Sequence, residues 1–164
     1  MISIEAQWWP VEVLTQYQVV AGQMQVRGRF LSQLNDPEPI VQLREISTTP
    51  LLAGAPRLQG IGFGQLNKAY FSVVRTLQTE PPAPDAPAEL VRRFMYFQGA
   101  GFNVKGQVEF PAGADATRHA EMLFKNNFFA VADAAVSVVG SQAAPMSWPL
   151  AYVNKNLMIG LYLG

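Results

Sequence analysis

The sequence predicts a mostly β protein made of two pseudo-symmetric halves, each with four or five antiparallel strands, and one or two short helices in all. Three observations lead to this fold class. Apolar residues alternate with polar ones at the period of a β-strand, glycine, asparagine and proline interrupt these runs, and three blocks of the first half recur in order in the second. We expect the halves to close as small paired sheets or barrels.

The internal similarity consists of three matching segments that keep the same order in both halves. The matched residues are 13–30 with 91–108, 40–45 with 128–133, and 66–68 with 153–155. Few positions are identical, but three ordered matches favour a duplication over chance.

A proline-rich segment separates the halves. Pro81, Pro82, Pro84 and Pro87 cannot support a strand ladder or a helix interior, so residues 79–88 are predicted to be an extended connector. The predicted domains are therefore a first β repeat over residues 1–78 and a second over residues 89–164.

In the first half, strands are predicted over residues 12–20 and 23–31, with a turn at Ala21-Gly22 between them, because glycine accepts the positive φ of such turns. A strand over 40–47 follows. Residues 60–66 and 69–77 then read as a hairpin around Asn67-Lys68, since asparagine tolerates the left-handed conformation.

The second half is predicted to repeat this arrangement. Its expected strands are 94–98 and 102–110, then a hairpin of 150–153 with 157–163 around Asn154-Lys155. Asp115 can cap a helix over residues 115–126, which the first half lacks. Asp85 and Pro87 favour a short helical turn through residues 89–93.

Composition excludes several function classes. The chain has 164 residues and no cysteine, which excludes disulfides, thiolate metal sites and cysteine nucleophiles. Its 12 basic and 12 acidic residues give a net charge of zero, which argues against a phosphate-binding or nucleic-acid-binding surface. Only 15% of residues are charged, so we expect part of the surface to be covered by a partner.

Targeting signals and membrane spans are not predicted. The first ten residues lack a basic segment followed by an apolar run, and the apolar stretch at 128–139 is too short for a membrane helix and contains Asp133. We therefore expect a cytoplasmic protein without a membrane span.

Residues that could carry chemistry are few. His119 is the only histidine, and a solvated helix position is favoured over a general base or metal ligand. Glu45 and Asp133 occupy matching places in the halves and could share a proton, although polar strand ends explain them better. The glycines at 60, 62 and 64 have the wrong spacing for a nucleotide loop. No catalytic residue, metal or cofactor is predicted.

Aromatic residues near both ends of the chain are the predicted contact surface. Trp8 and Trp9 precede a proline, Trp148 does the same near the other end, and Tyr152 follows. Tryptophan and tyrosine are enriched in protein interfaces, so these four residues are the candidate interface.

The second half resembles a small bacterial β-domain family that has no assigned function. Leu123-Phe124-Lys125-Asn126 leads into the apolar run 128–133, and Val153-Asn154-Lys155 leads into the last strand. The resemblance covers residues 94–163 and implies a tandem copy of this β-domain; it implies no activity.

The leading functional hypothesis is a non-catalytic interaction or structural protein that forms a homo-oligomer or is a small subunit of a larger complex. The alternative is a binding module that holds an apolar small molecule between the repeats, lined by Phe102, Phe128, Phe129 and Trp148. An enzyme ranks third.

Overall fold

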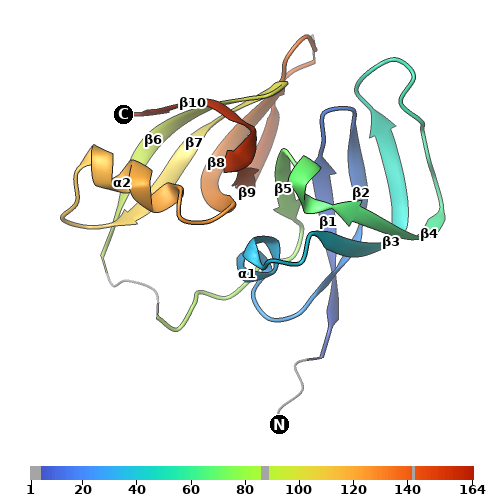
Figure 1. Cartoon of the computed structure of the whole chain (residues 1–164), viewed down its shortest axis with the longest axis horizontal. Helices are drawn as coiled ribbons and strands as arrows, with labels where there is room; N and C mark the ends of the chain where they lie inside the picture. Colours follow the sequence, from blue (N-terminus) through green and yellow to red (C-terminus); the bar gives the residue numbers. More distant parts are fainter. Residues whose placement is uncertain (1–4, 86–88, 142) are drawn as a thin grey trace. The chain divides into compact units, whose positions relative to one another are not determined.

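The computed structural model describes residues 5–85, 89–141 and 143–164. These residues form antiparallel strands and few helices, as the sequence predicts (Figure 1). The chain divides into two compact units, residues 1–80 and 81–164. The division lies at the start of the predicted connector.

The first unit contains five strands and one α-helix. In chain order they are β1 (Gln7–Leu14), β2 (Gln18–Val26), α1 (Phe30–Asn35), β3 (Ile40–Pro50), β4 (Ile61–Asn67), the 3₁₀ turn η1 (Lys68–Tyr70) and β5 (Val73–Thr76). Within the unit the strands lie side by side in the order β5-β1-β2-β3-β4.

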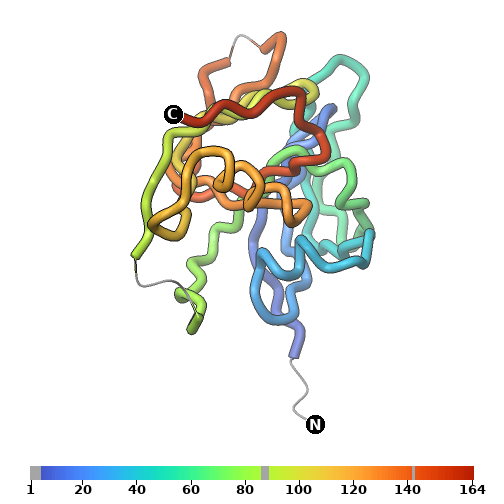
Figure 2. Tube along the Cα trace, turned by 60° about the vertical axis from the view of Figure 1, so that its left-hand side comes forward, coloured from blue at the N-terminus to red at the C-terminus, as the bar shows by residue number. Residues whose placement is uncertain are grey.

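The second unit has the same succession of elements. They are β6 (Leu90–Gly99), β7 (Phe102–Pro111), α2 (Ala116–Leu123), β8 (Phe128–Val138), β9 (Met146–Asn154), η2 (Lys155–Leu157) and β10 (Met158–Leu163), which Figure 2 follows from yellow-green to red. The strand order within the unit is β10-β6-β7-β8-β9. In both units the fifth strand pairs with the first.

Closed barrels do not form within the units. Among the described residues, β4 does not pair with β5, and β9 does not pair with β10, so each unit is an open five-stranded sheet. The two predicted hairpins around Asn67-Lys68 and Asn154-Lys155 are therefore wrong. Each Asn-Lys pair instead opens a 3₁₀ turn, and the chain crosses from the fourth strand to pair with the first.

The predicted turn at Ala21-Gly22 is also wrong. The tight connection lies at residues 15–17, where the Thr15 amide donates to the Gln18 carbonyl at 2.9 Å, and Gly22 lies inside β2. Residues 90–93 belong to β6 rather than to a helical turn, and Pro87 lies outside the described residues.

A β-bulge recurs at the same point of both sheets. In the first unit, Glu45 and Ile46 of β3 together oppose Gly22 of β2. In the second, Asp133 and Ala134 of β8 together oppose Gly106. The carbonyl that precedes each bulge points at the glycine: a Cβ on Gly22 would lie 3.0 Å from the Arg44 oxygen, and one on Gly106 would lie 2.8 Å from the Ala132 oxygen. Each bulge therefore needs glycine opposite it.

The positions of the bulges show which residues of the two halves are structurally equivalent. These equivalent residues differ in part from those matched in the sequence. Residues 40–45 and 128–133 take matching places, and so do Asn67 and Asn154, as the alignment has them. Gly22, however, takes the place of Gly106, whereas the alignment set Gly28 on Gly106. The first aligned block is thus out of register.

The core of each unit comes from the inward face of its strands and one helix face. In the first unit Trp9 stacks on Phe30 of α1, with ring centroids 5.8 Å apart. In the second, Phe97 packs at 5.8 Å against both Phe102 and Phe129. α1 was not predicted because its capping group is distant: the Phe30 amide donates to Glu80 Oε2 at 2.8 Å, fifty residues along the chain.

Candidate functional site

Three of the four predicted interface aromatics are buried. The exposed fractions of Trp9, Trp148 and Tyr152 are 6%, 3% and 4%, so these side chains belong to the interior. Trp8 alone is half-buried, and its ring carries the Arg44 guanidinium on one face. Alternation along β1 separates the two neighbours, since Trp8 and Trp9 lie on opposite faces of the strand.

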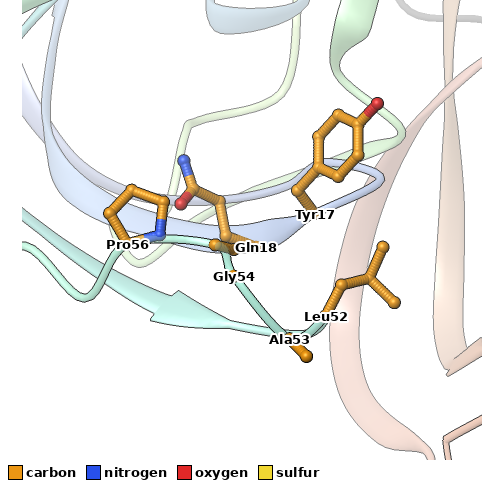
Figure 3. Close-up of a pocket in the computed structure, with 7 residues that line it drawn as sticks. Tyr17, Gln18, Leu52, Ala53, Gly54 and Pro56 are labelled. Atoms are coloured by element: carbon orange, nitrogen blue, oxygen red, sulfur yellow. The ribbon is translucent and has the colours of Figure 1, made fainter.

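The residues predicted to line an apolar pocket between the repeats are buried side chains. Phe102, Phe128 and Phe129 are 2–5% exposed and pack as core residues. A pocket of about 440 Å³ lies instead in the first unit (Figure 3). It is lined by the β1–β2 turn, the start of β2 and the segment after β3, through Tyr17, Gln18, Leu52, Ala53, Gly54, Ala55 and Pro56.

His119 is buried rather than solvated. It is 1% exposed and stacks on Phe110, with ring centroids 4.0 Å apart and an interplanar angle of 3°. Its Nδ1 accepts a hydrogen bond from Arg93 Nε at 2.9 Å, and its Nε2 has no partner in the described part of the chain. The histidine therefore ties α2 to β6 and β7.

Glu45 and Asp133 are the two bulge residues. Their φ values are 55° and 50°, in the left-handed region that side chains other than glycine seldom adopt. Both side chains are exposed, and Asp133 lies 3.9 Å from Arg92 Nη1. The sequence favoured polar strand ends for these residues, whereas each carboxylate lies inside a strand, on its bulge.

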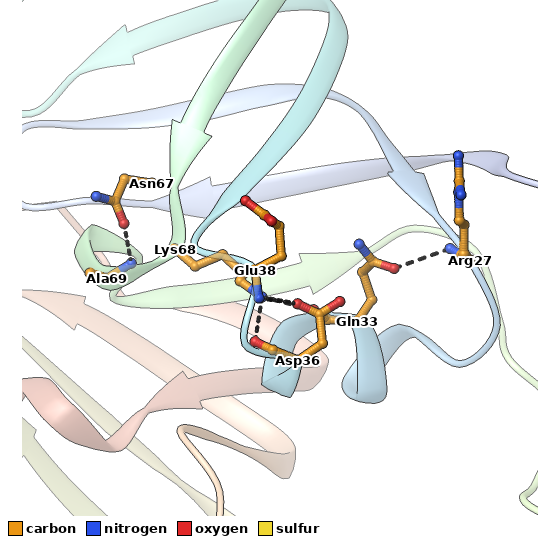
Figure 4. A network of polar contacts seen from close by, with 7 residues as sticks. All are labelled: Arg27, Gln33, Asp36, Glu38, Asn67, Lys68 and Ala69. Atoms are coloured by element: carbon orange, nitrogen blue, oxygen red, sulfur yellow. Dashed lines mark hydrogen bonds and ion pairs between the residues drawn. The ribbon is translucent and has the colours of Figure 1, made fainter.

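Lys68 is a buried charged side chain of the first unit. Its ammonium group donates to the Gln33 and Asp36 carbonyls at 3.0 Å and to Asp36 Oδ1 at 2.8 Å, beyond the end of α1 (Figure 4). Helix carbonyls at this end lack helical partners, and a cation satisfies them. In the second unit Lys155 Nζ similarly donates to the Phe124 carbonyl after α2.

The Asn-Lys pair therefore has a structural role. The Asn67 side chain accepts from the Ala69 amide at 2.9 Å, which forms the 3₁₀ turn and directs Lys68 inward. Asn154 does the same with the Asn156 amide at 3.0 Å. The recurrence of Asn-Lys in the sequence was the signal for this feature, although it was interpreted as a hairpin turn.

The outer edge of β4 is the exposed feature that the sequence analysis did not single out. β4 pairs with β3 along one side only, and no described strand pairs with its other side. Ile61 is 37% exposed and Phe63 is 57% exposed. Glycine occupies positions 62 and 64 of this strand. A Cβ on Gly64 would lie 2.6 Å from Ile46 Cδ1.

No protein-family model, curated protein or solved structure matches this chain. The resemblance of residues 94–163 to a small bacterial β-domain family therefore stays a prediction. Of the helices that the structure describes, none is long and apolar enough to cross a membrane. Within residues 5–85, 89–141 and 143–164, no three histidine, aspartate or glutamate side chains are grouped to hold a metal ion.

Proposed function

We propose that this chain is a non-catalytic interaction protein that assembles with copies of itself through the β4 edge. The observation that carries the proposal is that β4 is an edge strand without a charged residue or a proline. Unpaired backbone N–H and C=O groups on such an edge can pair with another strand, and natural proteins usually block them with charges, prolines or bulges.

Side chains and net charge support the same role. Phe63, at 57% exposure, supplies apolar area beside the unpaired backbone. The net charge of zero means that two copies approach without long-range repulsion. The matching order of elements in the two units further supports a duplication, which we include in the proposal.

The strand β10, at one end of the strand order of the second unit, is a less suitable contact. It also lacks charged residues and pairs only with β6 among the described strands, but its ladder is irregular between Met158 and Gly160. A bulge of this kind twists an edge and hinders addition of another strand. We therefore assign self-assembly to β4.

Replacing Phe63 with lysine is expected to weaken self-association by at least about tenfold, because like charges would meet near the contact. Light scattering and sedimentation at micromolar to submillimolar concentrations measure the effect. Tyr17→Lys is the matched control, since Tyr17 is 56% exposed but lies in the β1–β2 turn. If both variants weaken association equally, β4 is not the contact.

A mixing experiment tests whether the contact is between identical strands. Phe63→Lys and Phe63→Glu should each be monomeric alone and should form a dimer when mixed, because opposite charges then face each other. An unmodified protein that remains monomeric throughout the concentration range would contradict the proposed function.

The pocket of the first unit supports a second candidate function, the binding of an apolar small molecule. Its volume of about 440 Å³ lies in the range of small-molecule sites, and leucine, alanine and proline side chains contribute to its lining. Tyr17 and Gln18 are the polar members of a mostly apolar lining, so we expect a ligand held mainly by apolar contact.

Leu52→Trp is expected to fill this pocket and to reduce the fluorescence enhancement of the neutral dye Nile red by about half or more. Leu77→Trp is the control, because Leu77 is 56% exposed, close to the 47% of Leu52, and does not line the pocket. Equal enhancement in both variants would remove this candidate.

A further inference from the structure

We infer that Arg44 forms an anion-binding site on the outward face of the first sheet, and that its ligand is a carboxylate attached to an apolar body. The inference does not depend on self-assembly. It rests on the guanidinium group, on the side chains that hold it in place, and on the exposed ring of Phe63.

The orientation of the Arg44 guanidinium is fixed from two sides. Its carbon Cζ lies 4.3 Å from the centroid of the Trp8 ring, within the range of a cation–π contact. Its Nε donates to Gln23 Oε1 at 2.9 Å. A guanidinium held in this way loses little conformational entropy when it binds a ligand.

The two terminal nitrogens of Arg44 remain available. Neither Nη atom has a hydrogen-bond or ion-pair partner in residues 5–85, and neither is among the buried polar atoms that lack one. With Nε occupied by Gln23, the Nη1 and Nη2 N–H groups are free to bind both oxygens of one planar carboxylate.

Two other arginines of the first unit pair with a carboxylate of the protein. Arg29 pairs with Glu80 at 2.9 Å and Arg75 with Glu12 at 2.8 Å. Arg44, which is half-buried, is the one of these three arginines without a carboxylate partner among the described residues.

The second unit has no counterpart of the Arg44–Trp8 pair, because the position that matches Arg44 before its bulge is Ala132. At the place that Trp8 holds in the β1–β2 ladder, the β6–β7 ladder has Arg92 opposite Glu109, and their side chains lie 2.8 Å apart. Asp133 lies 3.9 Å from the same arginine. In the first unit the residue paired with Trp8 is Gln25, which carries no charge. Among the described residues no carboxylate pairs with Arg44, so its anionic partner in this proposal is a ligand.

The surroundings of Arg44 indicate the class of ligand. Phe63 is directly opposite Arg44 in the β3–β4 ladder and is 57% exposed. One guanidinium supplies one positive charge, which matches one carboxylate rather than a phosphate dianion. A carboxylate bound to Arg44 would place an attached apolar group against the Phe63 ring.

Phenylacetate is the probe for this site, and nitrogen–proton NMR spectra of the intact chain are the measurement. We expect saturable shifts of the Trp8 indole N–H and the Arg44 Nε–H, with a dissociation constant on the order of millimolar. Arg44→Gln should weaken binding at least about tenfold, and Arg44→Lys about fivefold, because lysine keeps the charge but lacks the planar fork. Arg57→Gln, at an exposed position in the segment between β3 and β4, should leave binding unchanged.

Three outcomes would overturn the inference. Sodium chloride at equal ionic strength could produce the same shifts, which would show a general salt effect. Arg44→Lys could bind phenylacetate as well as the unmodified chain, which would exclude recognition by the fork. Inorganic phosphate could bind more tightly than phenylacetate, which would make the ligand class wrong. Spectra recorded below the concentration of self-association separate this result from the proposed function.

Discussion

Lys68→Met is expected to lower the free energy of unfolding by about 3 kcal/mol, the lower end of the cost of breaking a buried ion pair. Methionine keeps the length of the side chain but removes the donor to the Gln33 and Asp36 carbonyls, and leaves Asp36 Oδ1 with the Glu38 amide alone. The estimate is at the lower end because the Asp36 side chain is 37% exposed, whereas that of Lys68 is 7% exposed.

Denaturant unfolding followed by circular dichroism measures this change. Lys125→Met is the control, because Lys125 is exposed and follows α2 without capping α1. A loss of less than about 1 kcal/mol for Lys68→Met would mean that water replaces the ammonium group, and that the lysine does not hold α1 against η1.

Gly106→Ala is expected to destabilise the second unit by about 3 kcal/mol through overpacking. The new Cβ would lie 2.4 Å from Val131 Cγ1 and 2.8 Å from the Ala132 carbonyl oxygen. The valine has few alternative rotamers and the carbonyl belongs to the bulge backbone, so the strand itself would have to move.

Gly62→Ala is the matched control for this substitution. Gly62 also lies in a strand, its φ is not positive, and a Cβ there would meet nothing within 4 Å. Thermal or denaturant unfolding at low protein concentration compares the two variants. Equal stability of Gly106→Ala and Gly62→Ala would show that the bulge can relax around an added methyl group.

Strands with clear alternation were predictable from the sequence. The predicted strand at 102–110 corresponds to β7, in which Phe102, Val104, Val108 and Phe110 are buried and the residues between them are more exposed. The helix after Asp115 was also predictable, because the Asp115 side chain accepts from the Arg118 amide at 2.9 Å within the same turn. Both signals are local in sequence.

Features that depend on distant residues were not predictable. β5 pairs with β1, about sixty residues earlier, so no turn between neighbouring segments reveals it. α1 has no side-chain cap of its own and is capped by Glu80. His119 was assigned to solvent, whereas it lies with Leu123 on the buried face of α2 and stacks on Phe110 of β7.

The candidate sites also depend on contacts between residues that are distant in the sequence. Trp8 was selected from the sequence for its residue type, but its contact with Arg44 joins β1 to β3, with β2 between them. The unpaired edge of β4 depends on which strands pair, and the sequence suggested the wrong partner. The residue types predicted which residues make contacts. The pairing of the strands determines which of those residues are exposed.

The paired bulges limit how these sheets can tolerate insertions and deletions. If β3 slid by two residues along β2, the carbonyl now above Gly22 would press on a residue with a side chain, since Val20 and Met24 occupy the next positions on that face. In each sheet, the close contact between the glycine and the bulge therefore permits only one register of the two strands. We expect insertions and deletions to be tolerated in connections such as residues 51–60, which lie outside the two strands whose register is fixed.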